Sequence, residues 1–291
     1  KLKAPMKEAD LTHVCFSRDS GLVAAASSEG HVALVHGMEH VHTLTGVHKK
    51  AVRHCCFNHS RTMLATASDD GTCGVWELSY EGPHGAAGRC VRVLKHDSIV
   101  RCCVFSPLGD YLVTAGDDLV VCLWYLSCWK ESGTRSQVFA QAAQSSSLRL
   151  QTEHWKFPGS SCVQAIRGHT GYVTSLAWSG LHEMIVTGAC DRTIRVHRRH
   201  PATRMWQCVE ELRFSASVET CDLDAFETML MVSCKGLSNM VVFDLASGAA
   251  ATVGAASHDE ADTGGGQAIL ACALQGTMGW IATASANGCI F

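Results

Sequence analysis

The sequence predicts an all-β protein that is built from repeated four-stranded units. One pattern recurs six times along the 291 residues, which indicates a repeat architecture. Each copy consists of short β-rich runs with Gly and Asp turn signals between them, as expected for strands joined by tight turns. Apolar residues make up 47% of the chain and charged residues 18%, a composition that excludes wholesale disorder.

Every copy of the pattern has an apolar anchor residue at the end of its first strand. The anchors are Phe16, Phe57, Phe105, Trp178, Leu223 and Leu274. Five residues before each anchor, and again seven residues after it, the chain has Val, Leu or Ile. Small or hydroxyl residues follow the second of these positions, as in Ala65-Thr66-Ala67-Ser68. Six copies in one register predict one repeated supersecondary unit.

Each copy accommodates four strands in a fixed order. The first strand has the form V-x-x-C-x-F and is apolar enough to be buried on both faces. The run of small residues forms the second strand, and a turn such as Asp69-Asp70-Gly71 leads to a third strand that ends in Val75-Trp76. The fourth strand is the stretch before the next copy, such as 90–94. Four short strands in a unit of this length are typical of a propeller blade.

Three landmarks within the copies point to a known family. A Gly-His pair stands at Gly168-His169, and His48 and His96 occupy the same offset in other copies. With the turn aspartates and the tryptophans of the third strands, these landmarks resemble the WD-repeat β-propeller family. The resemblance implies that four residues of a copy are joined in a hydrogen-bonded network. These would be His48, Thr66, Asp70 and Trp76 in the second copy, His96, Thr114, Asp118 and Trp124 in the third, and His169, Thr187 and Asp191 in the fourth, where His197 replaces tryptophan.

The resemblance covers nearly the whole chain and predicts a single propeller domain at 1–291. We expect repeats near 7–47, 48–95, 96–127, 162–213, 214–264 and 265–291, an insert at 128–161 and a loose loop at 248–266. Two architectures fit. One is a six-bladed ring in which residues 1–6 donate the outer strand of the last blade. The other is a seven-bladed ring with one blade outside this sequence, and seven is the commoner number in the family.

The 16 cysteines and 16 histidines first invite a metal or disulfide interpretation. No C-x-x-C pair occurs, and the adjacent pairs Cys55-Cys56 and Cys102-Cys103 would point to opposite faces of a strand. Four of the six positions two residues before the anchors are cysteine, which fits small apolar fillers on closely packed strands. We therefore expect reduced thiols, no metal site, no cofactor, and an intracellular protein of the cytoplasm or nucleus.

Several function classes lack their signatures in this sequence. The motifs G-x-S-x-G, Walker A, H-E-x-x-H and G-x-G-x-x-G are absent, so we expect no enzyme and no small-molecule substrate. A net charge of −3 gives no basic footprint for nucleic acid. The longest apolar stretch, Leu119–Leu126, is far shorter than the roughly 20 residues of a membrane helix.

The family commonly binds peptides on the rim formed by the turns before the first strands. Six residues of this chain fall at such positions: Lys49, Lys50, Arg53, Arg101, Tyr172 and Thr174. The lysines and arginines give two neighbouring blades a positive edge, which predicts binding of an acidic or phosphorylated segment. The alternative is an ordinary solvated rim.

The sequence therefore predicts a non-enzymatic protein–protein interaction scaffold. It would present its rim and loops to peptide segments or domains of partners in a multiprotein complex. An alternative is the substrate-recognition subunit of a ubiquitin ligase or a similar modifying complex. A phosphoinositide-binding propeller is less favoured, because the basic cluster His197-Arg198-Arg199-His200 lacks the Phe/Leu-Arg-Arg-Gly form of that group.

Overall fold

The computed structural model of the chain describes residues 10–17, 21–37, 39–80, 86–126, 162–180, 183–223, 228–237, 239–245, 247–254, 269–275 and 280–285. All regular structure in these ranges is β-strand, and they contain no helix able to cross a membrane. The chain divides into two compact units, Lys1–Arg167 and Gly168–Phe291.

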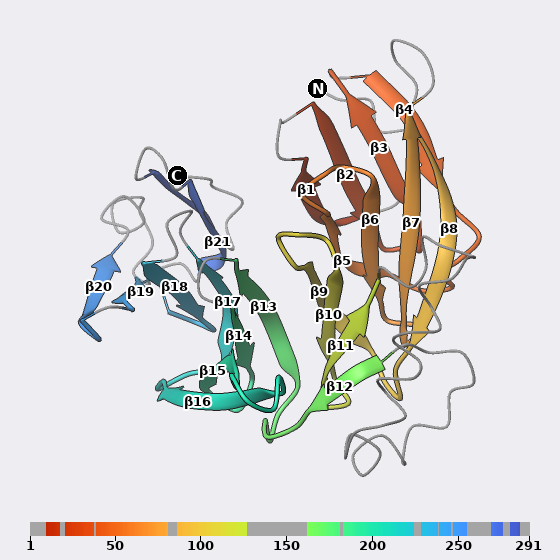
Figure 1. Ribbon diagram of the computed structural model, residues 1–291. Helices are drawn as coiled ribbons and strands as arrows, with labels where there is room; N and C mark the ends of the chain where they lie inside the picture. The colour runs from red at the N-terminus through yellow and green to blue at the C-terminus, as the bar shows by residue number, and fades with distance from the viewer. Residues whose placement is uncertain are drawn as a thin grey trace, which may run out of the picture. The chain divides into compact units, whose positions relative to one another are not determined.

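The first unit contains three four-stranded antiparallel sheets, each with its strands in chain order (Figure 1). The first sheet is β1 (Leu11–Phe16), β2 (Leu22–Ser27), β3 (Val32–His36) and β4 (Glu39–Leu44). The second is β5 (Val52–Phe57), β6 (Met63–Ser68), β7 (Thr72–Tyr80) and β8 (Ala86–Lys95). The third is β9 (Val100–Phe105), β10 (Tyr111–Gly116), β11 (Val121–Tyr125) and β12 (Cys162–Ile166).

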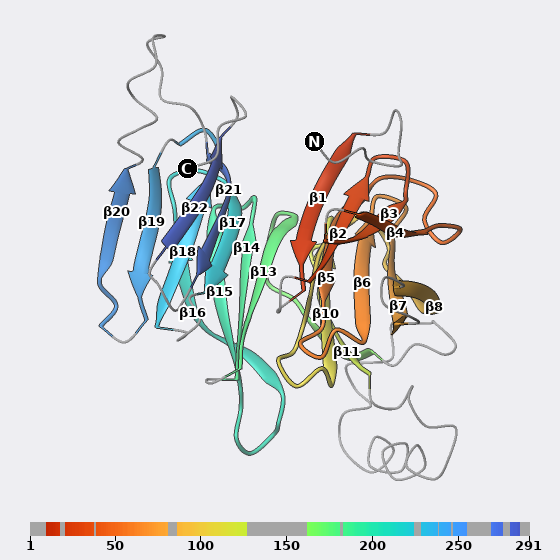
Figure 2. The same ribbon diagram turned by 90° about the horizontal axis from the view of Figure 1, so that it is seen from above.

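The second unit repeats the same meander twice and adds a hairpin (Figure 2). One sheet is β13 (Val173–Ser179), β14 (Met184–Ala189), β15 (Thr193–Arg199) and β16 (Trp206–Arg213). The next is β17 (Val218–Leu223), β18 (Met229–Cys234), β19 (Asn239–Asp244) and β20 (Ala250–Gly254). The hairpin is β21 (Ile269–Gln275) and β22 (Trp280–Ser285). These sheets confirm the predicted all-β class and the four-stranded unit.

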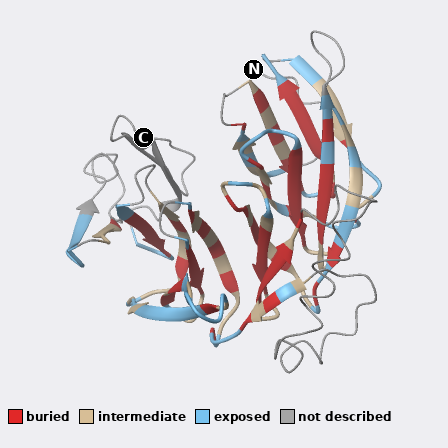
Figure 3. Cartoon of the chain, in the orientation of Figure 1, coloured by how far each residue is buried: buried red, intermediate tan, exposed pale blue. Residues whose placement is uncertain are grey.

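The first strand of each sheet packs against the first strand of the next sheet in the same unit. In the first unit β1 contacts β5 and β5 contacts β9; in the second, β13 contacts β17 and β17 contacts β21. The second strands β6 and β14 are buried along their whole length, whereas β16 is mostly exposed (Figure 3). The small residues of β6 fit this position, because its residues pack in apolar clusters with both the first and the third sheet.

The tight turn between the second and third strands requires a left-handed residue. Gly30 and Gly71 take this place with φ of +85° and +80°. A Cβ on Gly30 would lie 2.8 Å from the carbonyl oxygen of His48, so glycine is needed there for space as well as for its φ. Leu119 and Arg192 occupy the same turn position with φ of 64° and 67°, at the cost of local strain.

The structure differs from the predicted boundaries at two strands. Residues 162–166, which the sequence analysis assigned to the fourth repeat, form β12 and pair with β11 of the third sheet. The predicted loose loop at 248–266 begins with β20, which pairs with β19. The sequence of β20 is rich in Ala and Gly and gives no strand signal. This composition is possible because β20 lies at the edge of its sheet, where residues 250–252 are exposed. The insert at 128–161, residues 1–6 and residues 255–266 lie outside the described residues, so the blade number and the single domain stay predictions.

We expect Leu112→Ala to destabilise the first unit by about 3 kcal/mol. Leu112 is fully buried in β10, within the largest apolar cluster of this unit. Urea unfolding of the two proteins measures the difference. Leu108→Ala is the matched control, since Leu108 lies in the turn before β10 with 87% of its surface exposed and should change stability by less than about 0.5 kcal/mol. Equal losses for both variants would contradict the packing described.

Candidate functional site

The second sheet contains a buried network that is centred on the hydroxyl of Thr66. His48 Nε2 lies 2.7 Å from this oxygen, and the indole N–H of Trp76 donates to it at 3.0 Å. The other ring nitrogen of His48 lies 3.0 Å from the Thr72 hydroxyl and 3.4 Å from Asp70 Oδ2. All four residues that the family resemblance assigned to this copy are therefore brought together.

The third sheet repeats this network with shorter contacts. Both ring nitrogens of His96 are engaged, at 2.7 Å from Thr114 Oγ1 and 2.7 Å from Asp118 Oδ2. Trp124 donates its indole N–H to Thr114 at 2.7 Å. Thr114 is fully buried and His96 nearly so, so these polar groups rely on one another for hydrogen bonds in place of water.

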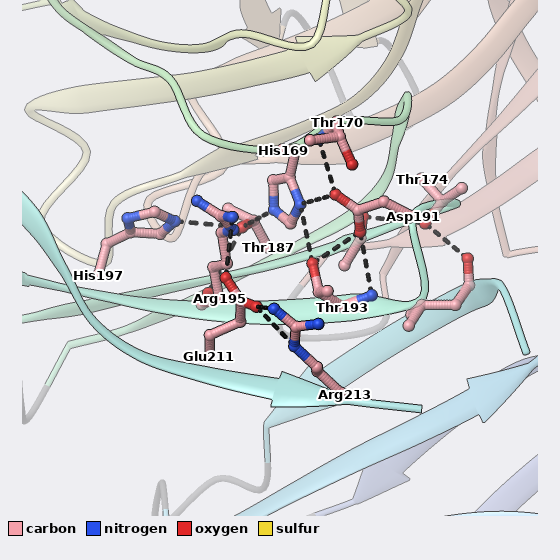
Figure 4. Close-up of polar contacts among 12 residues, drawn as sticks. His169, Thr170, Thr174, Thr187, Asp191, Thr193, Arg195, His197, Glu211 and Arg213 are labelled. Atoms are coloured by element: carbon pink, nitrogen blue, oxygen red, sulfur yellow. Dashed lines mark hydrogen bonds and ion pairs between the residues drawn. The ribbon is translucent and has the colours of Figure 1, made fainter. Parts of the chain in front are cut away.

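The fourth sheet has the same centre with one change (Figure 4). His169 lies 2.7 Å from Thr187 Oγ1 and 3.0 Å from Asp191 Oδ2. His197 takes the place of tryptophan, and its Nε2 lies 3.2 Å from the Thr187 hydroxyl. Its Nδ1 is buried and has no hydrogen-bond partner within the described part of the chain. Burial is the largest cause that lowers the pKa of His197 to about 4, and the charges of His169 and Arg195 add to it.

The aspartate of each network also fixes the chain on either side of it. Asp191 accepts the backbone N–H of Thr170 at 2.9 Å and the hydroxyl of Thr193 at 2.6 Å. Asp70 accepts the backbone N–H of Lys49 at 3.0 Å in the same way. Burial opposes the ionisation of Asp191, but the hydrogen bonds from Thr193, Thr170 and His169 outweigh it and lower the pKa to about 2. The carboxylate therefore ties the turn before the first strand to the turn after the second.

The two predicted rim arginines are each held in a forked ion pair with an aspartate of their own sheet. Arg53 donates from Nε and NH2 to the two carboxylate oxygens of Asp69, both at 2.7 Å. Arg101 makes the same fork with Asp117, where NH2 lies 3.2 Å from Oδ2. The hydrogen bond that Arg53 donates to Asp69 is the largest cause that raises the pKa of Arg53. Partial burial opposes this shift, and the negative charges of Asp69 and Asp117 add to it. The predicted positive edge thus has negative charges interleaved with its arginines.

The other predicted rim residues differ in what they can offer a partner. Lys49 and Lys50 are exposed, and neither ammonium group forms an ion pair with any residue that the structure describes. Tyr172 is partly buried. Thr174 is used within the fold, since its hydroxyl donates to the carbonyl oxygens of Gly188 at 3.0 Å and Val218 at 2.8 Å. Thr174 is therefore a packing residue, and the lysines are the accessible cations.

The basic cluster at 197–200 lies at the end of β15 and the start of the following turn. His197 is buried, whereas Arg198 and His200 are exposed. The Nε of Arg199 donates to the carbonyl oxygen of Arg204 at 3.1 Å, within the turn that leads to β16. This placement corresponds to a strand end, the simpler interpretation of the cluster.

Comparison with known proteins identifies the repeats. The model of the WD domain, G-beta repeat, matches residues 38–77, 88–125 and 160–198, which hold the three networks described above. These three repeats match the WD-repeat family. A solved chain in the "Crystal Structure of Mitotic Checkpoint Complex" is similar over 97% of this chain and 73% of its own length, with a TM-score of 0.69 and 17% identity, which shows the fold alone. No curated protein matches the chain significantly.

The WD-repeat landmarks in the sequence locate the networks but not the rim ion pairs. Arg53 and Arg101 stand four residues before their anchors, and Asp69 and Asp117 stand twelve residues after them. The antiparallel pairing of first and second strands brings these offsets together. The joint occurrence of Arg and Asp in the second and third copies was the available signal for these ion pairs.

The WD-repeat propeller is generally a non-catalytic interaction scaffold.

We expect Thr114→Val to destabilise the protein by about 3 kcal/mol, because it leaves the indole N–H of buried Trp124 without its acceptor and Nε2 of buried His96 without its hydroxyl partner. Thr114→Ser is the matched control, since it keeps the hydroxyl and removes only a methyl group. Urea unfolding followed by tryptophan fluorescence measures both. Equal free energies of unfolding for the valine and serine variants would show that the network does not stabilise the fold.

The buried His197 should make folding stability fall as the pH drops from about 6.5 toward 4. Its pKa in the folded state, about 4, lies below the usual value of 6.5, so the unfolded chain binds a proton first. The stability that depends on neutral His197 is complete above pH 6.5 and amounts to roughly 3 kcal/mol when fully lost.

Unfolding of His197→Phe at pH 7 and pH 4.5 tests this linkage. The variant should lose less stability between these two pH values than the unmodified chain. His40→Phe is the control, because His40 is exposed on β4 and its removal should leave the pH profile unchanged. Identical profiles for His197→Phe and the unmodified chain would contradict the assignment.

Proposed function

We propose that this chain is a non-enzymatic scaffold that binds acidic or phosphorylated segments of partner proteins at the rim of its first unit. The binding surface is the rim patch, defined as Lys49, Lys50, Arg53 and Arg101. The forked pairing of its arginines is the observation that carries the proposal. A guanidinium fixed by Asp69 or Asp117 is already oriented, so less side-chain entropy is lost when a partner binds.

The exposure of the patch allows a partner to reach these groups. The side chain of Arg53 is 49% exposed and that of Arg101 is 30% exposed, whereas their aspartates are 14% and 22% exposed. Arg53 engages Asp69 through Nε and NH2, which leaves NH1 outside the fork. A phosphate or carboxylate can therefore bind beside the aspartate or replace it. Replacement costs little, because exposed ion pairs contribute only about 0–1 kcal/mol.

The lysines supply the charge that favours an acidic partner over a basic one. Lys49 stands next to His48 in the network, and its backbone N–H is bound by Asp70. The buried network therefore holds the backbone of the exposed loop that carries both lysines. Positive groups presented on a fixed loop speed the encounter with acidic segments and select against basic ones.

The multiprotein setting of the similar solved chain is consistent with a scaffold role for this protein. The receptor subunit of a modifying complex is one case of such a scaffold. It would use the same acidic-segment binding, with an additional contact to the modifying enzyme.

The test is binding of fluorescent peptide pools of equal length, one acidic, one phosphorylated at Ser and Thr, and one basic, measured by anisotropy. We expect the acidic or phosphorylated pool to bind and its affinity to fall with salt. Two double variants, Lys49→Glu with Lys50→Glu and Arg53→Glu with Arg101→Glu, should each weaken binding by about tenfold or more.

Arg89→Glu is the matched control for these variants. Arg89 is 78% exposed and pairs with Glu77 across the outer strands β7 and β8, so it carries the same charge outside the rim patch. Its reversal should leave binding nearly unchanged. Unchanged binding in both rim variants, or preference for the basic pool, would refute the proposal.

A further inference from the structure

Two thiol pairs lie between the first strands of the first unit, each beside an imidazole. Cys15 Sγ on β1 lies 3.4 Å from Cys55 Sγ on β5, and His13 Nδ1 lies 3.5 Å from the same Cys55 sulfur. One sheet further on, Cys56 Sγ lies 3.7 Å from Cys103 Sγ, and Cys103 Sγ is 3.6 Å from a histidine ring nitrogen, that of His54. The two clusters have the same construction.

The repeat explains why the clusters recur. A His-x-Cys segment ends one residue before the anchor in the first two sheets, as His13-Val14-Cys15 and His54-Cys55-Cys56. Its side chains meet the cysteine two residues before the anchor of the next sheet, because consecutive first strands lie side by side (Figure 2). In the second unit the same contact joins the Ser175 hydroxyl to Cys221 Sγ at 3.1 Å. In the second unit, therefore, this place between the first strands holds a hydroxyl–thiol contact in place of a thiol pair.

The first pair combines a partly buried sulfur with a fully buried one. Cys15 is partly exposed, whereas Cys55 is inaccessible. The hydrogen bond donated by Cys15 is the largest cause that lowers the pKa of Cys55, to about 6, and His13 contributes against the effect of burial. The lone pair of His13 Nδ1 faces Cys55, because it also accepts the backbone N–H of that residue at 3.3 Å. Cys55 thus has both a thiol donor and a base beside its sulfur.

We propose that Cys15 and Cys55 are a peroxide-sensitive pair that forms a disulfide between β1 and β5. The sulfurs are close enough that bond formation needs a movement of little more than 1 Å, from 3.4 Å to the roughly 2.0 Å of a disulfide. The oxidant is hydrogen peroxide, which is small enough to reach the partly exposed sulfur of Cys15.

The reaction oxidises the two sulfurs and reduces the peroxide to water. The hydrogen bond to Cys55 and burial raise the pKa of the Cys15 thiol, so Cys15 reacts only after its proton has moved to Cys55. The Cys15 thiolate then attacks one peroxide oxygen. The O–O bond breaks, hydroxide leaves and takes a proton from solvent, and Cys15 becomes a sulfenic acid. Cys55 then attacks the Cys15 sulfur while His13 accepts its proton and passes it to the departing oxygen. The S–S bond forms and a second water leaves.

The consequence is a covalent cross-link between two sheets that are otherwise joined by the connecting chain at 45–51 and by noncovalent contacts. The first sheet carries an unusually exposed β1, with Phe16 65% and Leu11 53% exposed. A disulfide at Cys15 would anchor this strand to β5, which is fully buried at Cys55. Oxidation would thus restrain the first sheet, and reduction would release it.

Peroxide treatment of the chain, alkylation of the remaining thiols in denaturant and non-reducing tryptic mapping test the proposal. We expect the peptides 8–18 and 54–61 to appear joined, with a mass about 2 Da below the sum of the two reduced peptides. Because Cys56 shares the second peptide, the link should persist in Cys56→Ser and disappear in Cys15→Ser. His13→Gln should slow its formation by roughly tenfold, through loss of the base.

Cys208→Ser is the matched control, since Cys208 is an exposed thiol on β16 and its removal should leave the rate unchanged. The proposal is overturned if peroxide oxidises Cys208 while Cys15 stays unlinked, or if Cys15 links to Cys56 in preference to Cys55. A melting temperature that rises on oxidation of the unmodified chain but not of Cys15→Ser would support the restraint.

Discussion

The second, third and fourth sheets depend on a buried threonine hydroxyl in their second strand. In the second and third sheets this oxygen receives contacts from one histidine and one tryptophan, and the histidine reaches an aspartate at the next turn. A polar group in this position would be costly if any partner were missing, because the side chain is fully buried. The network therefore fixes the first strand's entry turn, the second strand and the following turn together. The hydrogen-bonded network therefore also sets the backbone position of the adjacent rim residues.

Two other sheets have apolar residues in place of the threonine and tryptophan of the network. The first sheet has Ala25 and Val35 where the second has Thr66 and Trp76, and the fifth has Val232 and Val242. Replacing all partners by apolar residues avoids an unpaired polar group, so these sheets keep the fold without the landmarks. The fourth sheet is intermediate, because His197 contacts the threonine but leaves its second nitrogen unpaired. That single departure makes His197 one source of the fold's pH sensitivity, because burial lowers its pKa to about 4.

The spacing within one copy was sufficient to predict the strands, and the resemblance to the WD-repeat family implied the three networks. The Arg53–Asp69 fork and the use of Thr174 in packing depend on strand pairing and on the neighbouring sheet, which no single copy shows. The thiol pairs depend on two copies at once, so the periodicity of the cysteines did not reveal their contacts. The pairing of β12 with β11 could not be predicted from one copy, because an insert separates the two strands in the sequence.

The central claim is that the buried network holds the exposed rim in place. Hydrogen exchange at the backbone amide of Lys49 tests it most directly, because this exposed residue donates its amide to Asp70 Oδ2. Thr170 makes the equivalent bond to Asp191 in the fourth sheet. The account predicts that both amides exchange far more slowly than an unstructured loop, and that Asp70→Ala abolishes the protection of Lys49 while that of Thr170 remains. Exchange of both amides at the rate of an unfolded peptide in the unmodified chain would contradict it.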